Sequence, residues 1–301
     1  MNTTALFPVD LGDKRLDNRC NKLIEQLMAK PSSSIPQACM SWKDTKAAYR
    51  FFANDEIDPE DIFEAHYKET VRRIQKTDGV ILVPQDTTDL SYTTHKKTTG
   101  LGSMGSFKNL YGMHVHSALA ATEAGIPLGL LSQYRCARDP KQFGKKTKDR
   151  NKTYMLPIEQ KESIKWIKTV EAVEQAIPEG KTVVVIGDRE SDIYPLFAHK
   201  RKENVHLLVR ASSNRGVDSE EGKLFATMEA LPKKGTIAIQ LSKTPVRKPR
   251  QATLTIKYTE VTLKSPNVGK GRAKGRVSLF CVSRPKRNTH QKENRLFPGP
   301  F

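Results

Sequence analysis

The sequence predicts a mixed α/β protein, with a small all-helical N-terminal part followed by a β-sheet core. Three observations carry this prediction. Helical periodicity dominates residues 1–77, apolar runs of strand length then alternate with helical segments, and the residues after 211 alternate polar and apolar side chains. A chain of 301 residues is long enough to bury a sizeable core in one large or two medium domains.

Four helices are expected in the N-terminal part. Their predicted ranges are 11–30, 35–42, 46–52 and 59 to the turn at 78. Asp44 is expected to cap the third helix, and Asp58 followed by Pro59 is a strong start signal for the fourth. The outer faces of these helices are basic, so this part of the chain is suited to docking on DNA.

Two short apolar runs each read as a buried strand, and each delivers an aspartate where the strand is expected to stop. The runs are 80–84 and 182–187, and the aspartates are Asp86 and Asp188. Either aspartate alone is explained by a local role, because Asp commonly caps turns and helices. Together they indicate a metal site, since strand-end carboxylates suit hard cations such as Mg²⁺.

The segments around these runs complete the predicted core. They are a strand over 111–120, its hairpin partner over 128–134, helices over 164–177 and 191–202, and a strand over 205–210. Mixed sheets of this order fit an RNase H-like nuclease core, whose first and fourth strands carry acidic ligands. The alternating segments 235–242, 252–264 and 276–282 predict an antiparallel sheet inserted into that core.

The predicted division of the chain is therefore a helical DNA-binding domain at 1–77, a core at 78–282 and a tail at 283–301. Within the core, 211–282 forms the β-rich insertion. His114 and His116 alternate along one strand and share a face. As metal ligands they would need a third partner, so half-buried strand histidines are expected instead.

Charge points to a polyanionic partner. The sequence carries 51 Lys and Arg against 33 Asp and Glu, a net charge of +18, for which nucleic acid is the default partner. No apolar run approaches the length of a membrane span, and the first residues lack the apolar stretch of a signal peptide. The four cysteines have no CxxC spacing and read as reduced thiols of a cytoplasmic protein. The segments 93–108 and 135–152 read as basic loops near phosphates.

Several short motifs then resemble one family. They are Gly12-Asp13-x-Arg15, Ala48-Tyr49-Arg50-Phe51, Asp86-Thr87-Thr88-x-Leu90-Ser91-Tyr92, Val115-His116-Ser117, Asp188-Arg189-Glu190-x-Asp192-Ile193 and Val209-Arg210. In this order and spacing, from about residue 11 to 282, the chain resembles bacterial cut-and-paste DDE transposases, and more narrowly the insertion-sequence-four family.

The resemblance implies an N-terminal domain that recognises transposon ends and an active site dependent on Mg²⁺ or Mn²⁺. Asp86 and Asp188 match the first two catalytic, metal-binding carboxylates. The positions expected on DNA are Arg15, Arg19, Lys46, Arg50, Arg189 and Arg210. The implied partners are double-stranded DNA, as transposon ends and as target, and a second copy of the chain in intact members of the family. The implied location is the cytoplasm, at the nucleoid.

One departure from the family concerns its third carboxylate. That residue is a Glu on a helix where Tyr, Arg, Glu and Lys recur, and nothing after Val282 matches this signature. Glu293 is the one acidic residue of the tail and lacks the partner Tyr and Lys. The expectation is a truncated or frameshifted transposase with impaired catalysis and an apolar sheet face left uncovered. Two alternatives remain: a non-catalytic DNA-binding inhibitor of transposition, and a nuclease that uses two carboxylates with substrate phosphate.

Overall fold

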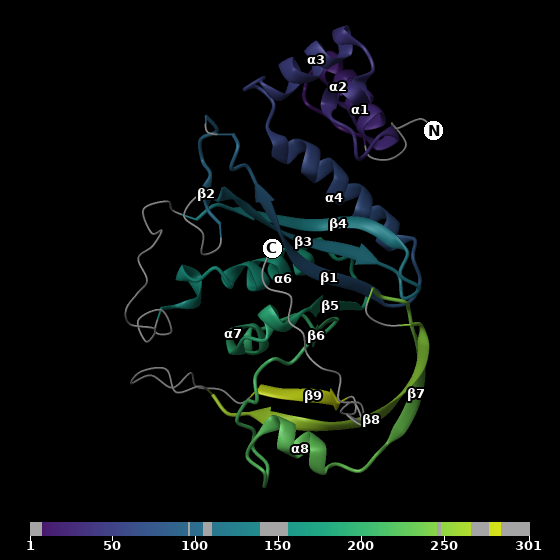
Figure 1. The fold of residues 1–301 in the computed structure, drawn as a ribbon, viewed down its shortest axis with the longest axis vertical. Coiled ribbons are helices and arrows are strands. Elements are labelled where there is room, and N and C mark those ends of the chain that lie inside the picture. The colour runs from purple at the N-terminus through teal and green to yellow at the C-terminus, as the bar shows by residue number, and fades with distance from the viewer. Residues whose placement is uncertain are drawn as a thin grey trace. The chain divides into compact units, whose positions relative to one another are not determined.

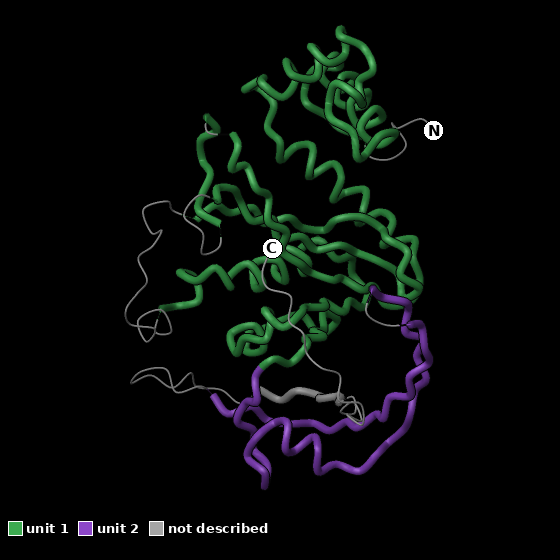
Figure 2. The backbone as a smooth tube through the Cα atoms, viewed as in Figure 1, with its two compact units in different colours: residues 1–212 green, residues 213–301 purple. Residues whose placement is uncertain are grey.

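The computed structural model describes residues 8–95, 97–104, 110–138, 156–245, 248–265 and 277–283. Helices form its N-terminal part and a mixed β-sheet follows (Figure 1), which confirms the predicted α/β fold class. The chain divides into two compact units, residues 1–212 and residues 213–301 (Figure 2). The large sheet belongs to the first unit and a three-stranded sheet to the second.

The N-terminal helices follow the predicted pattern. They are α1 (Lys14–Ala29), α2 (Ile35–Cys39), α3 (Trp42–Phe52) and α4 (Pro59–Gln75). The expected cap of α3 is wrong, because Ser41 and not Asp44 is the N-cap. The Ser41 hydroxyl accepts the backbone N–H of Asp44 at 3.0 Å, so the helix starts earlier, at Trp42. The Asp58 side chain caps α4 as predicted, by accepting from the backbone N–H of Glu60.

A small apolar core joins α1, α2 and α3. Its buried members are Val9, Cys20, Leu23, Cys39, Ala48 and Phe51. Cys20 and Cys39 are free thiols in this core, and burial raises the pKa of Cys20 to about 11. Ile62 and Ala65, in the first half of α4, pack against the same core. The helical domain therefore continues directly into α4.

The second half of α4 packs on the large sheet. Ile74 is fully buried in the core of that sheet, and Val71 packs beside it. Two hydrogen bonds attach the helix to β4 (Pro127–Cys136): the Arg73 guanidinium donates to the carbonyl of Leu128 at 2.9 Å, and His66 Nε2 accepts the backbone N–H of Leu130 at 3.0 Å. A single helix thus links the small helical core to the sheet.

The large sheet has six strands. They are β1 (Ile81–Ser91), β2 (Gly102–Ser103), β3 (Tyr111–Ala121), β4, β5 (Val183–Gly187) and β6 (Val205–Val209). Their order is β2-β3-β1-β5-β6, and β4 also pairs with β3. β1, β3 and β4 are antiparallel neighbours, whereas β1, β5 and β6 run parallel. The two apolar runs that precede the aspartates are therefore adjacent strands.

One strand boundary differs from its prediction. β1 does not stop at Asp86 but continues to Ser91, pairing with β3 from Asp86↔Ser117 to Ser91↔Gly112. Asp86 marks instead the place where the parallel neighbour β5 ends. The local apolar run ends near Asp86, but pairing with β3 keeps the polar residues beyond it extended.

Helix α6 (Ile164–Ala176) covers one face of the sheet through the predicted apolar stripe. Its buried side chains include Trp166, Ile167, Val170 and Val173. The helix predicted over 191–202 is shorter, comprising a 3-10 turn at Arg189–Ser191 and α7 (Tyr194–Ala198). The Arg201 guanidinium donates to the carbonyls of Leu196 and His199, and so satisfies the backbone where α7 ends. A further 3-10 turn spans Ile158–Gln160.

The second unit contains α8 (Leu224–Ala230) and the predicted antiparallel sheet of β7 (Gly235–Leu241), β8 (Arg250–Leu263) and β9 (Val277–Ser283). Its two faces are less sharply divided than the alternation predicts. Tyr258, expected on the dry face, is 43% exposed. Lys257, expected on the wet face, donates to the carbonyl of Glu229 in α8 at 2.6 Å. The amine thereby satisfies a carbonyl in the last turn of α8.

Some predictions fall on residues outside the described ranges. These are the tail from 284 onward with Glu293, most of the basic loop at 135–152, and part of the loop at 93–108. Among the described helices, none combines the length and the apolar character needed to cross a membrane.

The contact between His66 and β4 predicts an acid-sensitive stability. Burial and the nearby Arg73 charge lower the pKa of His66 below its usual 6.5. As the pH falls, His66 is therefore protonated at a higher pH in the unfolded chain than in the folded one. The free energy of unfolding then decreases as the pH drops below about 6.5. Between pH 7.5 and 5, thermal melts of wild type should lose more stability than those of His66→Gln. The Gln amide can still accept from Leu130 but does not titrate, and parallel curves for the two proteins would contradict this assignment.

Candidate functional site

The two aspartates singled out by the sequence come from neighbouring parallel strands. The last residue pair in the register of β1 with β5 is Pro84 with Ile186. Two positions further along each chain segment are Asp86 and Asp188, and Asp188 keeps an extended backbone with φ −79° and ψ −162°. Because the strands run in the same direction, the aspartates lie side by side where the parallel pairing stops.

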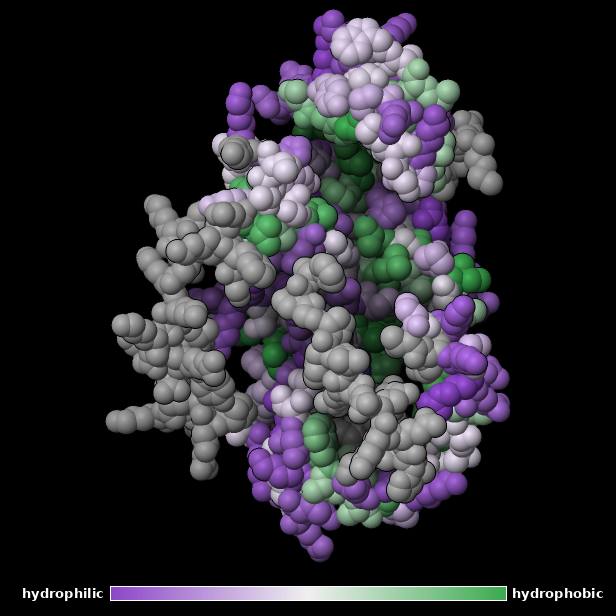
Figure 3. Space-filling view, viewed as in Figure 1, coloured by the Kyte–Doolittle hydropathy of each residue, from purple (hydrophilic) through white to green (hydrophobic). Residues whose placement is uncertain are grey.

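Both aspartates project from the open face of the sheet. Side chains alternate along β1, so Val83 is buried whereas Pro84 and Asp86 are exposed. Asp188 is exposed as well, and Leu208 of β6 is 57% exposed. Hydrophobic residues are visible near the middle of Figure 3, in the region where Figure 1 shows the sheet. Exposed apolar side chains thus lie on the same sheet as the pair.

The carboxylates are oriented by the backbone that follows them. Asp86 Oδ1 accepts the N–H of Thr87 at 2.8 Å, and Asp188 Oδ1 accepts the N–H of Glu190 at 2.8 Å. Within the described ranges, His, Cys, Asp and Glu side chains form no group of three or more that could hold a metal ion. Mg²⁺ and Mn²⁺ favour oxygen ligands, and Mg²⁺ is often held by one or two carboxylates with water and substrate phosphate. The pair fits a cation of this kind.

Two of the predicted DNA-binding arginines border this pair. The backbone N–H of Arg210, just after β6, donates to the carbonyl of Gly187 at 3.1 Å, so Arg210 lies next to the residue that precedes Asp188. Arg189 follows Asp188 directly, in the 3-10 turn. Both arginines are exposed. The edge of the sheet therefore combines two carboxylates with two cationic side chains.

A buried histidine lies behind the carboxylate pair, on the face covered by α6. His116 of β3 is 1% exposed, not half-buried as predicted. Its Nε2 is 3.0 Å from Gln85 Oε1 and its Nδ1 is 2.9 Å from Thr87 Oγ1. Burial, and then the Lys165 charge, lower the pKa of His116 to about 4, while the charges of Asp86 and Asp188 oppose this shift. Both carboxylates are therefore near this one imidazole.

Three further residues near the pair were not among the predicted site residues: Trp166, Lys165 and Glu190. Trp166 packs edge-on against the His116 ring, with a centroid distance of 4.4 Å. The side chain of Lys165 is only 12% exposed, and its Nζ lies 3.5 Å from Glu190 Oε2. Sequence periodicity could place Trp166 on a helix, but it could not reveal which strand residues the ring contacts.

His114, the second strand histidine, is also buried, with 9% exposure. Its Nδ1 lies 2.6 Å from Asp89 Oδ1, and its Nε2 has no hydrogen-bond partner. His114, like His116, is therefore buried rather than half-buried as predicted.

The predicted DNA-binding residues of the helical part occupy two settings. Lys46 and Arg50 are exposed on α3, on a surface where Trp42 is 79% and Tyr49 is 53% exposed. A helix that presents aromatic and cationic side chains together suits contact with a nucleic acid.

Arg15 and Arg19 of α1 are engaged in ion pairs. The Arg15 side chain is 91% exposed and lies 3.0 Å from Asp13. Arg19 is 28% exposed and contacts Asp44, whose pKa is lowered to about 2 mainly by hydrogen bonds from Lys22 and Ser41, with Arg19 contributing. Asp44 thus ties α1 to α3, and Arg15 is the more accessible of the two arginines.

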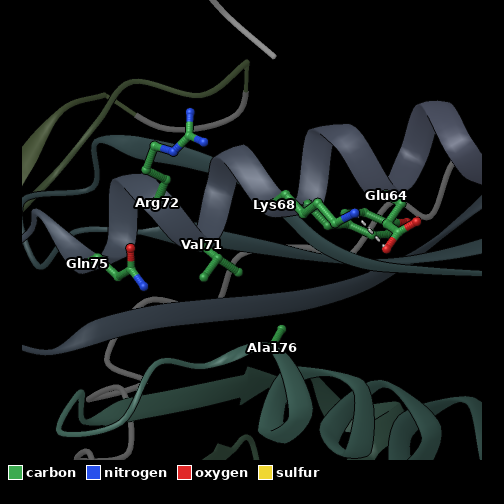
Figure 4. Close-up of a pocket in the computed structure, with 7 residues that line it drawn as sticks. Glu64, Lys68, Val71, Arg72, Gln75 and Ala176 are labelled. Atoms are coloured by element: carbon green, nitrogen blue, oxygen red, sulfur yellow. Dashed lines mark ion pairs between the residues drawn. The ribbon is translucent and has the colours of Figure 1, made fainter. Parts of the chain in front are cut away.

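A pocket in the described part of the chain lies elsewhere. It has a volume of about 330 Å³ and lies along α4, between Tyr67, Val71, Gln75 and Ala176 of α6 (Figure 4). Lys68 and Glu64 form an ion pair at its rim. None of its lining residues is a predicted site residue. Nucleic acids bind to open charged surfaces, so this pocket does not define the site.

Comparison with known proteins assigns the helical part. Residues 4–57, the segment that contains α1–α3, match the family described as Transposase DNA-binding. The structure is also similar to a piggyBac transposase in a cryo-EM synaptic complex with hairpin DNA. The TM-score is 0.33 with 11% sequence identity, over 88% of this chain and 51% of that one. The chain thus spans about half the length of that transposase.

The proximity of two like charges predicts that the pair of carboxylates lowers the stability of the fold. Asp188→Asn keeps the hydrogen bond to Glu190, because Asn caps as well as Asp, but removes one charge. In the presence of a chelator its melting midpoint should rise by about 2 °C relative to wild type, and excess Mg²⁺ should cancel the gain. Asp55→Asn, at an exposed loop position, is the control. It should keep the wild-type melting midpoint both with chelator and with excess Mg²⁺. A lower midpoint for Asp188→Asn would contradict the argument from repulsion.

Proposed function

We propose that this protein is a cut-and-paste DDE transposase by descent, of the insertion-sequence-four type, which binds transposon-end DNA and has impaired cleavage in its present form. The observation that supports this most is the adjacency of Asp86 and Asp188 on parallel strands, in a chain whose residues 4–57 match the Transposase DNA-binding family. Neither feature alone would specify the reaction.

The proposed chemistry is phosphoryl transfer on DNA. Asp86 and Asp188 would hold Mg²⁺ or Mn²⁺, which when bound polarises the phosphodiester and activates the attacking water. Water forms the new bond to phosphorus, the bond to the 3′ oxygen breaks, and that oxygen leaves as a hydroxyl after protonation. The same hydroxyl can then attack a second strand. Arg189 and Arg210 border the carboxylates and would offset phosphate charge.

Recognition of the DNA would be divided between two surfaces. Lys46 and Arg50 on α3, with Arg15 on α1, would bind the transposon end, whereas the arginines at the sheet edge would hold the cleaved strand. Arg19 would act through its ion pair with Asp44, which fixes α1 against α3. Binding as a pair of chains, as in intact members of the family, belongs to the same proposal.

The proposed impairment rests on the third carboxylate. No segment after Val282 carries the Tyr, Arg, Glu, Lys pattern that would supply it. Reading the other two frames downstream of the codon for Val282 tests whether a frameshift removed it. The alternative function, a DNA-binding inhibitor of transposition, would use the helical domain alone and rests on the match of residues 4–57.

DNA binding should depend on α3 and on salt. In fluorescence anisotropy with duplex transposon ends, the double variant Lys46→Ala, Arg50→Ala should bind more weakly. The slope of log affinity against log salt should decrease in magnitude by about 2, because two phosphate contacts are lost. Lys68→Ala, with a side chain 72% exposed on α4, is the matched control and should keep the wild-type slope. An unchanged slope for the double variant would exclude α3 as the DNA-binding surface.

Cleavage should depend on the carboxylate pair. With Mg²⁺ or Mn²⁺ and end-containing DNA, any nicking by wild type should be lost in Asp86→Asn and in Asp188→Asn, while DNA binding is retained. Binding without nicking by the wild-type protein would favour the inhibitor function. Nicking that persists in both variants would refute the assignment of these aspartates.

A further inference from the structure

We propose that the buried pair of His116 and Trp166 is a positioning unit that holds Asp86 and Asp188 in the spacing needed to bind a divalent cation. This inference rests on the proposed function, since it takes the two aspartates as ligands. It adds residues of β3 and α6 that do not touch the cation, and it explains why a histidine is fully buried behind an open acidic site.

The imidazole of His116 bridges the two residues on either side of Asp86. Gln85 and Thr87 point to the covered face of the sheet, whereas Asp86 points to the open face. Holding both neighbours at 3.0 Å and 2.9 Å fixes the backbone of β1 at the position of the carboxylate. Contacts on the face covered by α6 therefore set the direction of the Asp86 side chain on the opposite face.

The two hydrogen bonds select one tautomer of the His116 imidazole. Gln85 Oε1 can only accept, so His116 Nε2 carries the proton and donates to it. His116 Nδ1 is then an acceptor for the hydroxyl of Thr87. Every polar atom of the neutral ring is used, which makes the bridge specific in orientation as well as in distance.

Trp166 extends this support from β1 to β5. Its ring packs against His116 at 4.4 Å, and it also lies next to Gly187, the residue before Asp188. A Cβ atom built on Gly187 would lie 3.4 Å from Trp166 Cζ3 and 2.2 Å from Ser191 Oγ. Ser191 leaves no room for a side chain at Gly187, and the Trp166 ring lies at about contact distance from the same position. The indole therefore lies beside both strands that carry the aspartates. A shift of the Trp166 indole toward or away from the sheet would therefore move β1 relative to β5.

The structure offers a matched control in His114. It is on the same strand and the same face, is similarly buried, and also contacts a β1 side chain, that of Asp89. It does not flank either proposed ligand. Substituting His114 should thus disturb packing about as much as substituting His116, without acting on the cation site.

The test is Mn²⁺ affinity of the full chain, measured by electron paramagnetic resonance of free Mn²⁺, together with the thermal midpoint of each variant. His116→Gln should weaken Mn²⁺ binding about tenfold, since residues that orient metal ligands typically contribute 10- to 100-fold to affinity. Thr87→Val keeps the side-chain shape, removes one hydrogen bond of the bridge and should weaken binding by a smaller factor. His114→Gln should keep the wild-type affinity, and Asp86→Asn should lose most of it.

Equal Mn²⁺ affinities for wild type, His116→Gln and Thr87→Val, with a loss in Asp86→Asn, would overturn the positioning role and leave the proposed metal site intact. Wild-type affinity in Asp86→Asn would instead overturn the metal site, and the positioning role with it. If His116→Gln does not fold, Thr87→Val decides the question, because its isosteric change leaves the ring of His116 in place. An equal loss in His114→Gln and His116→Gln would show a general packing effect and also overturn the proposal.

Discussion

The parallel pairing of β1 with β5 is the constraint on which the rest of the structure depends. It joins two segments far apart in the sequence and brings Asp86 and Asp188 to the same edge of one sheet. The pairing is stabilised on one face only, where Ile81, Val83 and Val185 are buried under α6. On the other face, Asp86 and Asp188 are exposed among the described residues.

The side-by-side position of Asp86 and Asp188 has a cost in stability. Two carboxylates held close together repel each other, and the fold tolerates this because the cost is small compared with the apolar burial beneath them. Behind them, both ring nitrogens of His116 are hydrogen-bonded, one to Gln85 and one to Thr87. Acidic groups at the surface and a satisfied network below are compatible with a site that gains stability when it binds a cation.

Helix α4 gives the helical domain a defined connection to the sheet. One end packs in the core of α1–α3 through Ile62 and Ala65, and the other is buried in the sheet through Ile74. The helix is continuous from Pro59 to Gln75. One continuous helix thus joins the small helical core to the large sheet.

The sequence by itself determined the features that depend on local order. Helical and strand periodicity identified α1, α4, α6 and the strands other than β2, which lies in the predicted loop at 93–108. Asp58 with Pro59 marked the start of α4, and the two apolar runs pointed to Asp86 and Asp188. These signals are readable because capping and amphipathic patterns act between residues a few positions apart.

Only the tertiary structure decided what lies around those residues. β1 continues past Asp86 because β3 pairs with it, Asp44 of α3 binds Arg19 of α1, and His116 is buried between Gln85, Thr87 and Trp166. Each of these outcomes depends on contacts between segments distant in sequence. Periodicity carries no information about the partner across a sheet, so the sequence could name the two aspartates but not the residues that hold them.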